Sequence, residues 1–305
     1  MDQKEKAILQ HLLVNCRMSY RKLGGLVGLT GSSVKKRIDL LMKSGFIQRF
    51  LVYINPDSSN LRFSNVIAYT DSSIGIESFT NAVRKHEGMY LVYPFTSGDF
   101  YVGFDYSKDK DLDALCSTIE QMPGVLRIER FKQQLADEKE FRPDAPEFTL
   151  NEAKVLDQLL VDARMPDHLI AANSGLPIKM VRRILDDFEN GDRLWFTLAW
   201  NPNLGRNITF TCIIRHKADR FSGKDFLDWL DTEFPSDYWA TRDYPSQQTM
   251  FSFFVTERLP SMEEASQAIL SYPGVESCST HTHYTAFNRN PLIRTRLERL
   301  VEQKL

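Results

Sequence analysis

An internal repeat constrains this chain more than any other feature. Residues 12–18, which read Leu-Leu-Val-x-x-Arg-Met, return 147 residues later as residues 159–165 with the same five amino acids. One folding unit therefore occurs twice, and its function has to be compared between the two copies. Each copy also begins with a side-chain acceptor three residues before a glutamate, the capping-box pattern that starts a helix: Asp2 with Glu5, and Thr149 with Glu152.

The repeat extends beyond this string and divides the chain near residue 148. The apolar positions 8, 9, 12 and 13 correspond to 155, 156, 159 and 160, the same stripe at helical spacing. The Gly-Leu pair at 28–29 recurs at 175–176, and Val-Lys-Lys at 34–36 recurs as Val-Arg-Arg at 181–183. With 305 residues, the chain is long enough for two to four domains that each bury a core.

The composition is that of an ordinary globular protein. Charged residues make up 26% of the chain and hydrophobic residues 42%. No apolar run approaches the roughly 20 residues that span a bilayer, and the N-terminus lacks a signal-peptide pattern. We therefore expect a cytoplasmic protein without a membrane partner.

The cysteines and histidines do not predict a metal site. Cys16, Cys116, Cys212 and Cys278 are isolated in the sequence, whereas structural zinc needs clustered ligands. The pair at residues 281 and 283 would place two imidazoles on one face of a strand, but no carboxylate or cysteine stands beside them. We predict no metal and no cofactor, and we expect the cysteines to be small buried hydrophobic residues.

Residues 1–56 have the pattern of a winged helix-turn-helix. A first helix is predicted over about 5–15, a second from Ser19, and a third over about 32–44, which Thr30 can cap and Gly45 ends. The aromatic and aliphatic residues 46–54 are typical of strands and predict the wing. The second helix is expected to face the core with Tyr20, Leu23 and Leu26.

Residues 57–131 follow a different pattern. Strands are predicted over 62–70, 90–95, 100–104 and 126–131, with helices over 77–86 and 112–121. That order, βαββαβ, is typical of a ferredoxin-like sheet with helices on one face. Residues 132–147 are charged and contain two prolines, so they predict a linker.

The second half repeats this programme. Residues 148–202 predict a second three-helix unit, and residues 203–305 a second βαββαβ followed by a helix from residue 291 that has no counterpart in the first half. The predicted fold class is therefore α+β, as two tandem units. Each unit is a winged helix-turn-helix followed by a ferredoxin-like αβ-sandwich.

The third helix of the first unit is the predicted recognition helix. The outward residues at the start of such a helix reach base edges in the major groove. Small residues at 31–33 let the backbone approach, and the lysines one turn further in can reach phosphates or guanine edges. The predicted partner is double-stranded DNA, contacted by Arg21, Lys22, Thr30, Ser32, Ser33, Lys35, Lys36 and Arg49, with Arg37 on the flank for a phosphate.

Charge separates the two copies. Residues 1–56 hold ten basic and three acidic residues, a net charge of +7, while the whole chain carries −2. Residues 148–202 hold six basic and eight acidic residues, a net charge of −2. There Pro177 replaces the cap, Ile-Lys-Met at 178–180 replaces Gly-Ser-Ser, and the acidic residues 186, 187, 189 and 192 would repel phosphate. We predict a degenerate unit with a weaker DNA-contacting cluster at Lys179, Arg182 and Arg183.

The two halves resemble the Lrp/AsnC (leucine-responsive, or feast/famine) family of transcription regulators. The resemblance rests on Gly-Leu-Thr at 28–30, Lys-Ser-Gly-Phe-Ile at 43–47, Thr-Ser-Gly-Asp-Phe-Tyr at 96–101 and Met-Pro-Gly-Val at 122–125. It implies a DNA-binding regulator whose sensing domains pair through their sheets and bind a small effector, often an amino acid. It also implies a homo-oligomer, a dimer of chains, or an intrachain pseudo-dimer.

The resemblance places an effector site near a predicted hairpin, at Thr96, Ser97, Gly98 and Asp99. The residues allow two interpretations of this turn. Its glycine permits a positive φ, and its carboxylate could meet an amino group of a ligand or cap local amides as a plain hairpin turn. In the second copy Gln247 and Gln248 replace the Gly-Asp pair, so the sensing pattern is lost there.

Two other functions compete with a DNA-binding regulator. Sirohaem decarboxylases resemble this family and occur as paired or fused halves, so the tandem chain could be a tetrapyrrole enzyme. Candidate residues for holding the carboxylates of such a substrate are His86, Arg242, His281 and His283. The basic first unit argues against this alternative. A third interpretation, an effector-binding or scaffold protein without a DNA role, suits the second half better than the whole.

Overall fold

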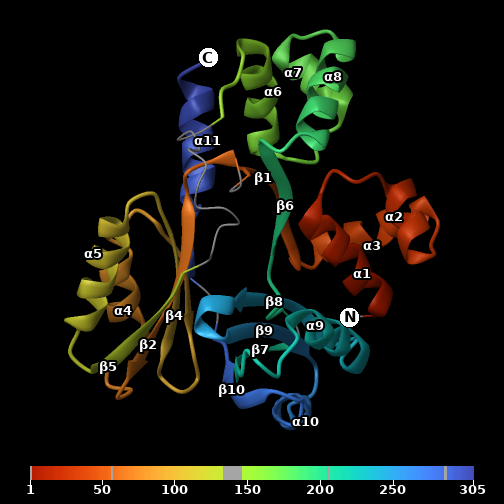
Figure 1. The fold of residues 1–305 in the computed structure, drawn as a ribbon. Coiled ribbons are helices and arrows are strands. Elements are labelled where there is room, and N and C mark those ends of the chain that lie inside the picture. Colours follow the sequence, from red (N-terminus) through yellow and green to blue (C-terminus); the bar gives the residue numbers. More distant parts are fainter. Residues whose placement is uncertain (1, 56–57, 133–145, 205, 285–286) are drawn as a thin grey trace. The chain divides into compact units, whose positions relative to one another are not determined.

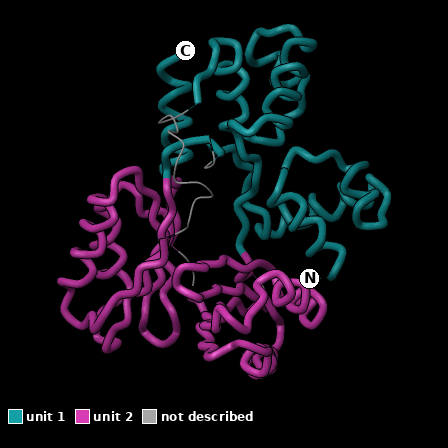
Figure 2. The backbone as a smooth tube through the Cα atoms, in the orientation of Figure 1, with its two compact units in different colours: residues 1–61, 137–201, 292–305 teal, residues 62–136, 202–291 magenta. Residues whose placement is uncertain are grey.

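The computed structural model describes residues 2–55, 58–132, 146–204, 206–284 and 287–305 (Figure 1). The chain forms two compact units that do not follow the two sequence copies (Figure 2). Unit 1 comprises residues 1–61, 137–201 and 292–305, and unit 2 comprises residues 62–136 and 202–291. Each unit therefore takes one part from each copy: unit 1 gathers both three-helix parts, and unit 2 gathers both βαββαβ parts.

The first three-helix part of unit 1 consists of α1 (Gln3–Val14), α2 (Tyr20–Val27) and α3 (Gly31–Lys43). The predicted capping box is confirmed, since the Glu5 amide donates to Asp2 at 2.7 Å and the Asp2 amide donates to Glu5 at 3.0 Å. Thr30 caps α3 as predicted, and its hydroxyl accepts from the Ser33 amide at 3.2 Å. Local side-chain chemistry thus sets where these helices begin.

The prediction that Leu26 faces the core is wrong. Leu26 is 53% exposed, while Leu23 and Val27 are buried. A four-residue step from Leu23 leads to Val27, so the inward stripe of this eight-residue helix passes beside Leu26. Leu26 lies on the outer face of α2.

The second three-helix part consists of α6 (Leu150–Val161), α7 (Asp167–Ser174) and α8 (Ile178–Asn190). Its capping box at Thr149 and Glu152 is also confirmed. The apolar residues that correspond to the core of the first copy are buried here as well; they are Val155, Leu156, Leu159, Val181 and Leu185. The repeat therefore encodes the same helical core twice.

The strands after the helices do not form separate wings. β1 (Ile47–Ile54) pairs antiparallel with β6 (Leu194–Trp200) of the other copy, with Phe50 opposite Leu198 and Val52 opposite Phe196. The predicted wing of residues 46–54 is thus corrected: its strand is real, but the other copy supplies its partner. Each strand thereby pairs the main-chain groups along one of its edges, and one two-stranded sheet joins the two copies.

The last helix, α11 (Leu292–Glu302), packs against β1 and α6 in unit 1. Ile293, Leu297 and Val301 form its buried face. Arg294 is buried too, and its guanidinium donates to the carbonyl oxygens of Val52 at 3.0 Å and Leu160 at 2.6 Å. The domain division predicted for residues 203–305 is therefore corrected, because this helix belongs with the three-helix parts.

The first αβ-sandwich of unit 2 has the predicted βαββαβ order. Its elements are β2 (Arg62–Thr70), α4 (Ile76–Val83), β3 (Met89–Pro94), β4 (Phe100–Tyr106), α5 (Asp109–Glu120) and β5 (Val125–Lys132). The strands lie in the order β11-β3-β4-β2-β5, where β11 (Phe287–Asn288) comes from the second copy. Lys132, predicted to begin the linker, belongs to β5, and residues 133–145 of that linker lie outside the described residues.

The second αβ-sandwich repeats this topology. Its elements are β7 (Ile208–His216), α9 (Gly223–Glu233), β8 (Tyr238–Tyr244), the short 3-10 helix η2 (Pro245–Gln247), β9 (Thr249–Thr256), α10 (Pro260–Leu270) and β10 (Val275–Thr282). The strand order is β10-β7-β9-β8. The predicted fold class, two tandem copies of a winged helix-turn-helix and a ferredoxin-like sandwich, is confirmed. Among the described helices, none is both long and apolar enough to cross a bilayer.

The two sheets of unit 2 meet through the faces that their helices leave uncovered. One apolar cluster contains Ile67 and Phe131 of the first sheet together with Ile213, Tyr244 and Phe251 of the second. Polar contacts continue this interface: Arg215 donates to both carboxylate oxygens of Glu129 at 2.8 Å. The two sandwiches thus pair within one chain, as an intrachain pseudo-dimer.

Candidate nucleic-acid interface

A tight glycine turn positions the predicted recognition helix α3. The Leu29 amide donates to the Gly24 carbonyl at 2.9 Å, and Gly28 has a φ of 66°. A Cβ on Gly24 would lie 2.4 Å from the Leu29 carbonyl oxygen. The close crossing of α2 and α3 therefore depends on a glycine at this position, and that crossing presents the start of α3.

The start of α3 is exposed, small and basic. Ser32, Lys35 and Lys36 are exposed, while Val34 and Ile38 fill the core behind them. Lys35 forms an exposed ion pair with Asp39 at 2.7 Å, a contact that contributes little because water competes for both groups. Lys36 forms no ion pair with any described residue. Both lysines can therefore turn toward an anionic partner at small cost.

The other basic residues predicted to contact DNA in the first copy divide into two groups. Arg21 and Lys22 on α2 and Arg49 on β1 are exposed, as a phosphate contact requires. Arg37 instead forms ion pairs with Asp2 at 2.5 Å and Glu5 at 3.4 Å, which tie α3 to the beginning of α1. Its predicted contact with a phosphate stays a prediction, but this guanidinium already has two carboxylate partners.

The second copy presents a different surface at the start of α8. Pro177 stands at the cap position and makes no side-chain hydrogen bond. Lys179, Arg182 and Arg183 are exposed, but Arg182 forms an ion pair with Asp167 at 3.3 Å. The exposed residues 186 and 187 add two carboxylates to the same helix. The cluster of three basic residues is thus partly neutralised.

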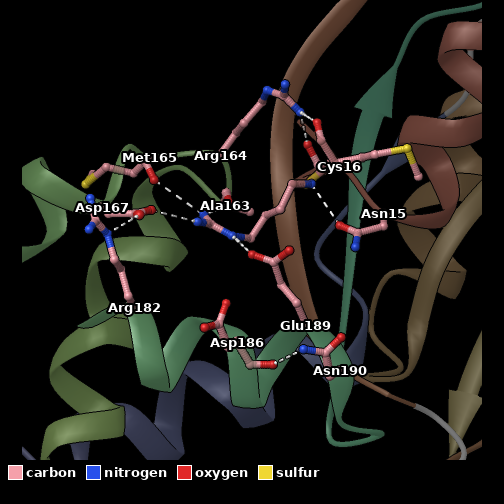
Figure 3. Close-up of polar contacts among 12 residues, drawn as sticks. Asn15, Cys16, Ala163, Arg164, Met165, Asp167, Arg182, Asp186, Glu189 and Asn190 are labelled. Atoms are coloured by element: carbon pink, nitrogen blue, oxygen red, sulfur yellow. Dashed lines mark hydrogen bonds and ion pairs between the residues drawn. The ribbon is translucent and has the colours of Figure 1, made fainter. Parts of the chain in front are cut away.

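The repeated arginines join the two copies (Figure 3). Arg17 of the first copy donates to the carbonyl oxygens of Ala163 at 2.9 Å and Met165 at 3.3 Å. Arg164 of the second copy donates to the corresponding carbonyl oxygens of Cys16 and, at 3.1 Å, Met18. We call this pair of contacts the arginine exchange. It relates the copies by a pseudo-two-fold operation, because each arginine binds the loop that carries the other.

The arginine exchange is unequal in its remaining partners. Arg17 forms a 2.7 Å ion pair with Glu189 and a 3.5 Å contact with Asp167 (Figure 3). Arg164 has no carboxylate partner among the described residues, and its guanidinium lies 4.5 Å from the ring centre of Tyr20. From the sequence, Glu189 was expected only to repel phosphate, and its ion pair with Arg17 was not predicted. The recurrence of Arg-Met at the same place in both copies could have indicated that the two arginines matter to the structure.

The predicted effector hairpin uses its polar groups internally. Asp99 accepts from the Thr70 amide at 2.9 Å through one carboxylate oxygen and from the Ser97 hydroxyl at 2.8 Å through the other. Gly98 has a φ of 91°, which a glycine adopts without strain. The Thr96 amide donates to Thr282 of the second copy at 3.1 Å. The hairpin is thereby held against the end of β10.

The four residues considered for a tetrapyrrole enzyme have different surroundings, although His281 and His283 both contact Phe95. His283 stacks on Tyr93 with 4.7 Å between ring centres, and His281 lies 4.6 Å from Phe95. Burial lowers the pKa of His283 to about 3 and also lowers that of His281. His86 instead hydrogen-bonds Thr118 of α5, and Arg242 is an exposed residue of β8. His281 of β10 and His283, which follows that strand, are therefore neutral rings at pH 7.

The described residues provide no group of three or more histidine, cysteine, aspartate or glutamate side chains that could hold a metal ion. Cys16, Cys116 and Cys212 are buried and Cys278 is half-buried, all as free thiols. Burial raises the pKa of Cys16 to about 12 and that of Cys116 to about 11, which keeps both thiols protonated.

Comparisons with known proteins point to one family. A model of the AsnC-type helix-turn-helix domain matches residues 1–42. The leucine-responsive regulatory protein of Escherichia coli (strain K12) is 30% identical over 135 residues, which cover 41% of this chain and 79% of that protein. An uncharacterised HTH-type transcriptional regulator of Pyrococcus furiosus is 24% identical over 92 residues, which cover 30% of this chain and only 62% of that protein.

One solved structure shares the fold over the whole chain. The siroheme decarboxylase NirDL aligns over 99% of this chain and 99% of its own, with a TM-score of 0.55 and 11% sequence identity. That protein has also been solved with an iron-uroporphyrin III analogue. At this identity the likeness establishes a common two-copy architecture and nothing about chemistry.

Proposed function

Because this chain belongs to the leucine-responsive (Lrp/AsnC) family, we propose that it is a sequence-specific transcription regulator that contacts double-stranded DNA through α3. The observation that carries the proposal is the start of α3, where Ser32, Lys35 and Lys36 are exposed on a helix held by the Gly24 turn. A regulator of this kind works beside the chromosome, so we infer a cytoplasmic location.

Only the first copy is suited to reading bases. Its surface is basic and its groove-facing positions are small, whereas α8 begins with Pro177 and Ile178 and carries exposed carboxylates. One chain therefore supplies one recognition helix, and the second three-helix part mainly completes the fold of unit 1. We infer that a two-fold symmetric DNA site needs two chains, while a single chain reads an asymmetric half-site.

The test compares two matched double variants. DNA fragments that the wild-type protein retains from its source genome provide the probe, and fluorescence anisotropy measures affinity over a range of salt concentrations. Lys35→Ala/Lys36→Ala should weaken binding by about tenfold or more. It should also lower the slope of log K against log salt by about 0.9 for each phosphate that the variant no longer neutralises.

The matched control is Lys179→Ala/Arg183→Ala on α8, which removes the same number of charges from the second copy. It should weaken binding much less than the α3 variant and change the salt slope by a smaller amount. Unchanged binding by the α3 variant would refute the placement of the recognition helix. An equal loss of affinity in both variants would show that the two copies contact DNA alike.

An amino-acid effector at residues 96–99 stays part of the proposal. Because internal hydrogen bonds occupy both carboxylate oxygens of Asp99, such a ligand would meet the backbone of the turn and the Ser97 hydroxyl. Gly98→Ala should disturb this turn, since a Cβ there would lie 2.4 Å from the Ser72 hydroxyl oxygen. Loss of an amino-acid response on DNA, with DNA affinity retained, would support the site.

A tetrapyrrole-decarboxylating enzyme remains the second candidate, supported by the full-length fold shared with NirDL. The arrangement of the candidate residues favours it less, because stacking encloses His283 and His86 contacts a helix instead. A titration of the purified protein with sirohaem tests this second candidate function. A saturable shift of the Soret band and turnover to a decarboxylated product would promote this candidate over the DNA-binding one.

A further inference from the structure

An arginine of the second copy binds the first copy at the beginning of α2. The Arg164 guanidinium donates to the carbonyl oxygen of Cys16 (Figure 3) and, at 3.1 Å, to that of Met18, in the loop that leads into this helix. It also lies 4.5 Å from the ring centre of Tyr20, the first residue of α2. Arg164 therefore fixes both the path of the loop and the first side chain of the helix.

The beginning of α2 in turn supports the recognition helix. Gly31, the first residue of α3, packs so closely that a Cβ on it would lie 3.4 Å from the Arg21 amide nitrogen and from the Tyr20 carbonyl carbon. Ser19 caps α2 by accepting from the Lys22 amide at 3.2 Å. A shift of this segment would therefore move the start of α3 together with the two basic side chains of α2 that are predicted to contact phosphates.

The charges at this helix start differ between the copies. Tyr20 corresponds to Asp167 of the second copy, where Arg17 forms its 3.5 Å contact with the carboxylate. The first turn of α2 contains no acidic residue, whereas Asp167 lies in the first turn of α7. Arg164 pairs with no carboxylate of the described residues. It thus adds a positive charge beside a helix N-terminus, an arrangement that opposes the helix dipole unless an anion lies nearby.

Stability alone does not account for this difference. A carboxylate at residue 20 would give Arg164 an ion pair and would suit the helix dipole, as Asp167 does in the other copy. A tyrosine provides a ring for the guanidinium and leaves its charge uncompensated, so that it can attract the phosphate groups of DNA.

We propose that Arg164 is a positioning residue for DNA binding. The second copy holds the DNA-contacting edge of the first copy in place, without contacting DNA itself; this edge consists of Arg21, Lys22 and the start of α3. The inference rests on the proposed function of α3. Arg17, the corresponding residue of the first copy, holds the loop before α7 and has no such role, because the second copy is unsuited to reading bases.

Three single variants test this role by fluorescence anisotropy, with the DNA fragments that the wild-type protein retains. Arg164→Met should weaken DNA binding about tenfold. Arg164→Lys keeps the positive charge but not the fork of donors, and it should recover part of that loss. The matched control, Arg17→Met, removes the same charge and more contacts from the same junction, and it should change the affinity by less than about twofold.

A double-mutant cycle shows whether Arg164 acts through α2. In an Arg21→Ala/Lys22→Ala background, measured at low salt where α3 still provides binding, Arg164→Met should weaken DNA binding by less than about threefold. The reason is that the contacts which Arg164 positions are already absent in this background. A residue that contacts DNA independently would give its full tenfold effect there.

Hydrogen exchange provides a readout that does not involve DNA. The Leu23 amide donates to the Ser19 carbonyl at 2.9 Å in the first turn of α2. It should exchange faster in Arg164→Met than in the wild-type protein and at an unchanged rate in Arg17→Met, since only Arg164 holds this turn.

Wild-type affinity in a folded Arg164→Met variant, an equal loss of affinity in Arg17→Met, or additive effects in the cycle overturns the inference. These results leave the proposed function intact if Lys35→Ala/Lys36→Ala weakens binding. If that double variant binds DNA like the wild-type protein, the recognition helix itself is misplaced, and the proposed function fails together with the inference.

Discussion

The arginine exchange allows a quantitative prediction about unit 1. The Arg17 side chain is only 8% exposed. Arg17→Met keeps most of its aliphatic stem and removes the guanidinium. The change breaks the hydrogen bonds to Ala163 and Met165 and the ion pair to Glu189. We expect it to destabilise the junction between the two copies rather than the helices themselves.

The magnitude follows from these partners. A hydrogen bond to a charged group contributes about 1.5–3 kcal/mol when it is desolvated, and each carbonyl left without its partner costs about 1 kcal/mol. Glu189 is 29% exposed and Asp167 37% exposed, so water partly replaces the missing guanidinium at both carboxylates. Two such hydrogen bonds at the lower end of this range, with about 1 kcal/mol for the screened ion pair, give a destabilisation of about 4 kcal/mol for Arg17→Met. Arg164→Met removes two hydrogen bonds to carbonyls, about 3 kcal/mol on the same scale, and the interaction with Tyr20, about 0.5 kcal/mol.

Hydrogen exchange measures this effect where it should occur. The Cys16 amide donates to Phe196 across the copies at 3.1 Å, so its exchange rate reports the opening free energy of this junction. A double-mutant cycle between Arg17→Met and Glu189→Gln should give a coupling of about 1–2 kcal/mol, which falls as salt is added. The same cycle between Arg164→Met and Glu189→Gln should give none.

The reasoning fails if Arg17→Met lowers the opening free energy by less than about 0.5 kcal/mol. It also fails if Arg164 couples to Glu189 as strongly as Arg17 does. The first result would mean that the β1–β6 sheet holds the copies together without help from Arg17. The second would mean that the two arginines are equivalent toward Glu189.

Two further predictions concern the glycine turn and the buried histidine. Gly24→Ala should cost about 2 kcal/mol or more in urea unfolding and reduce DNA affinity, because its Cβ would meet the Leu29 carbonyl; the neighbouring Gly25→Ala, with open space around it, should be neutral or stabilising by up to about 1 kcal/mol. The lowered pKa of His283, about 3, means that the unfolded chain binds a proton there that the folded chain refuses. The unfolding free energy should therefore fall by about 1.4 kcal/mol per pH unit as the pH drops from about 6.5 toward 3. His283→Phe should remove this contribution and flatten the acid-unfolding profile of the full chain, and an unchanged pH profile would contradict the burial of a neutral ring.

Short-range patterns made much of this fold predictable. Capping boxes, the apolar stripe of the first helix and the βαββαβ order depend on residues only a few positions apart, and the structure has all of them. The inward face of α2 was harder to predict, because a helix of eight residues has little more than two turns over which a periodic pattern can repeat. Leu26 was therefore wrongly predicted to face the core. Local periodicity is reliable when the element is long enough to repeat it.

The candidate DNA interface was predictable in the same way. Exposed basic residues on a capped helix follow from spacing and charge, and the structure exposes Lys35 and Lys36 as expected. It differs for Arg37, whose carboxylate partners lie 32 and 35 residues earlier in the chain. No pattern in a single sequence states which of several nearby charges such an arginine will pair with.

The sequence by itself determined that one fold occurs twice, that the copies differ in charge, and which residues cap the first helix of each copy. Only the tertiary structure decided that β1 pairs with β6, that Arg17 and Arg164 bind each other's loops, and that Arg215 pairs with Glu129 of the other copy. The physical reason is the separation along the chain of the residues that interact. Helix periodicity and capping are set by neighbours within about one turn, whereas these contacts join residues of different copies. Packing and hydrogen bonding in three dimensions decide which of the two similar copies supplies each partner.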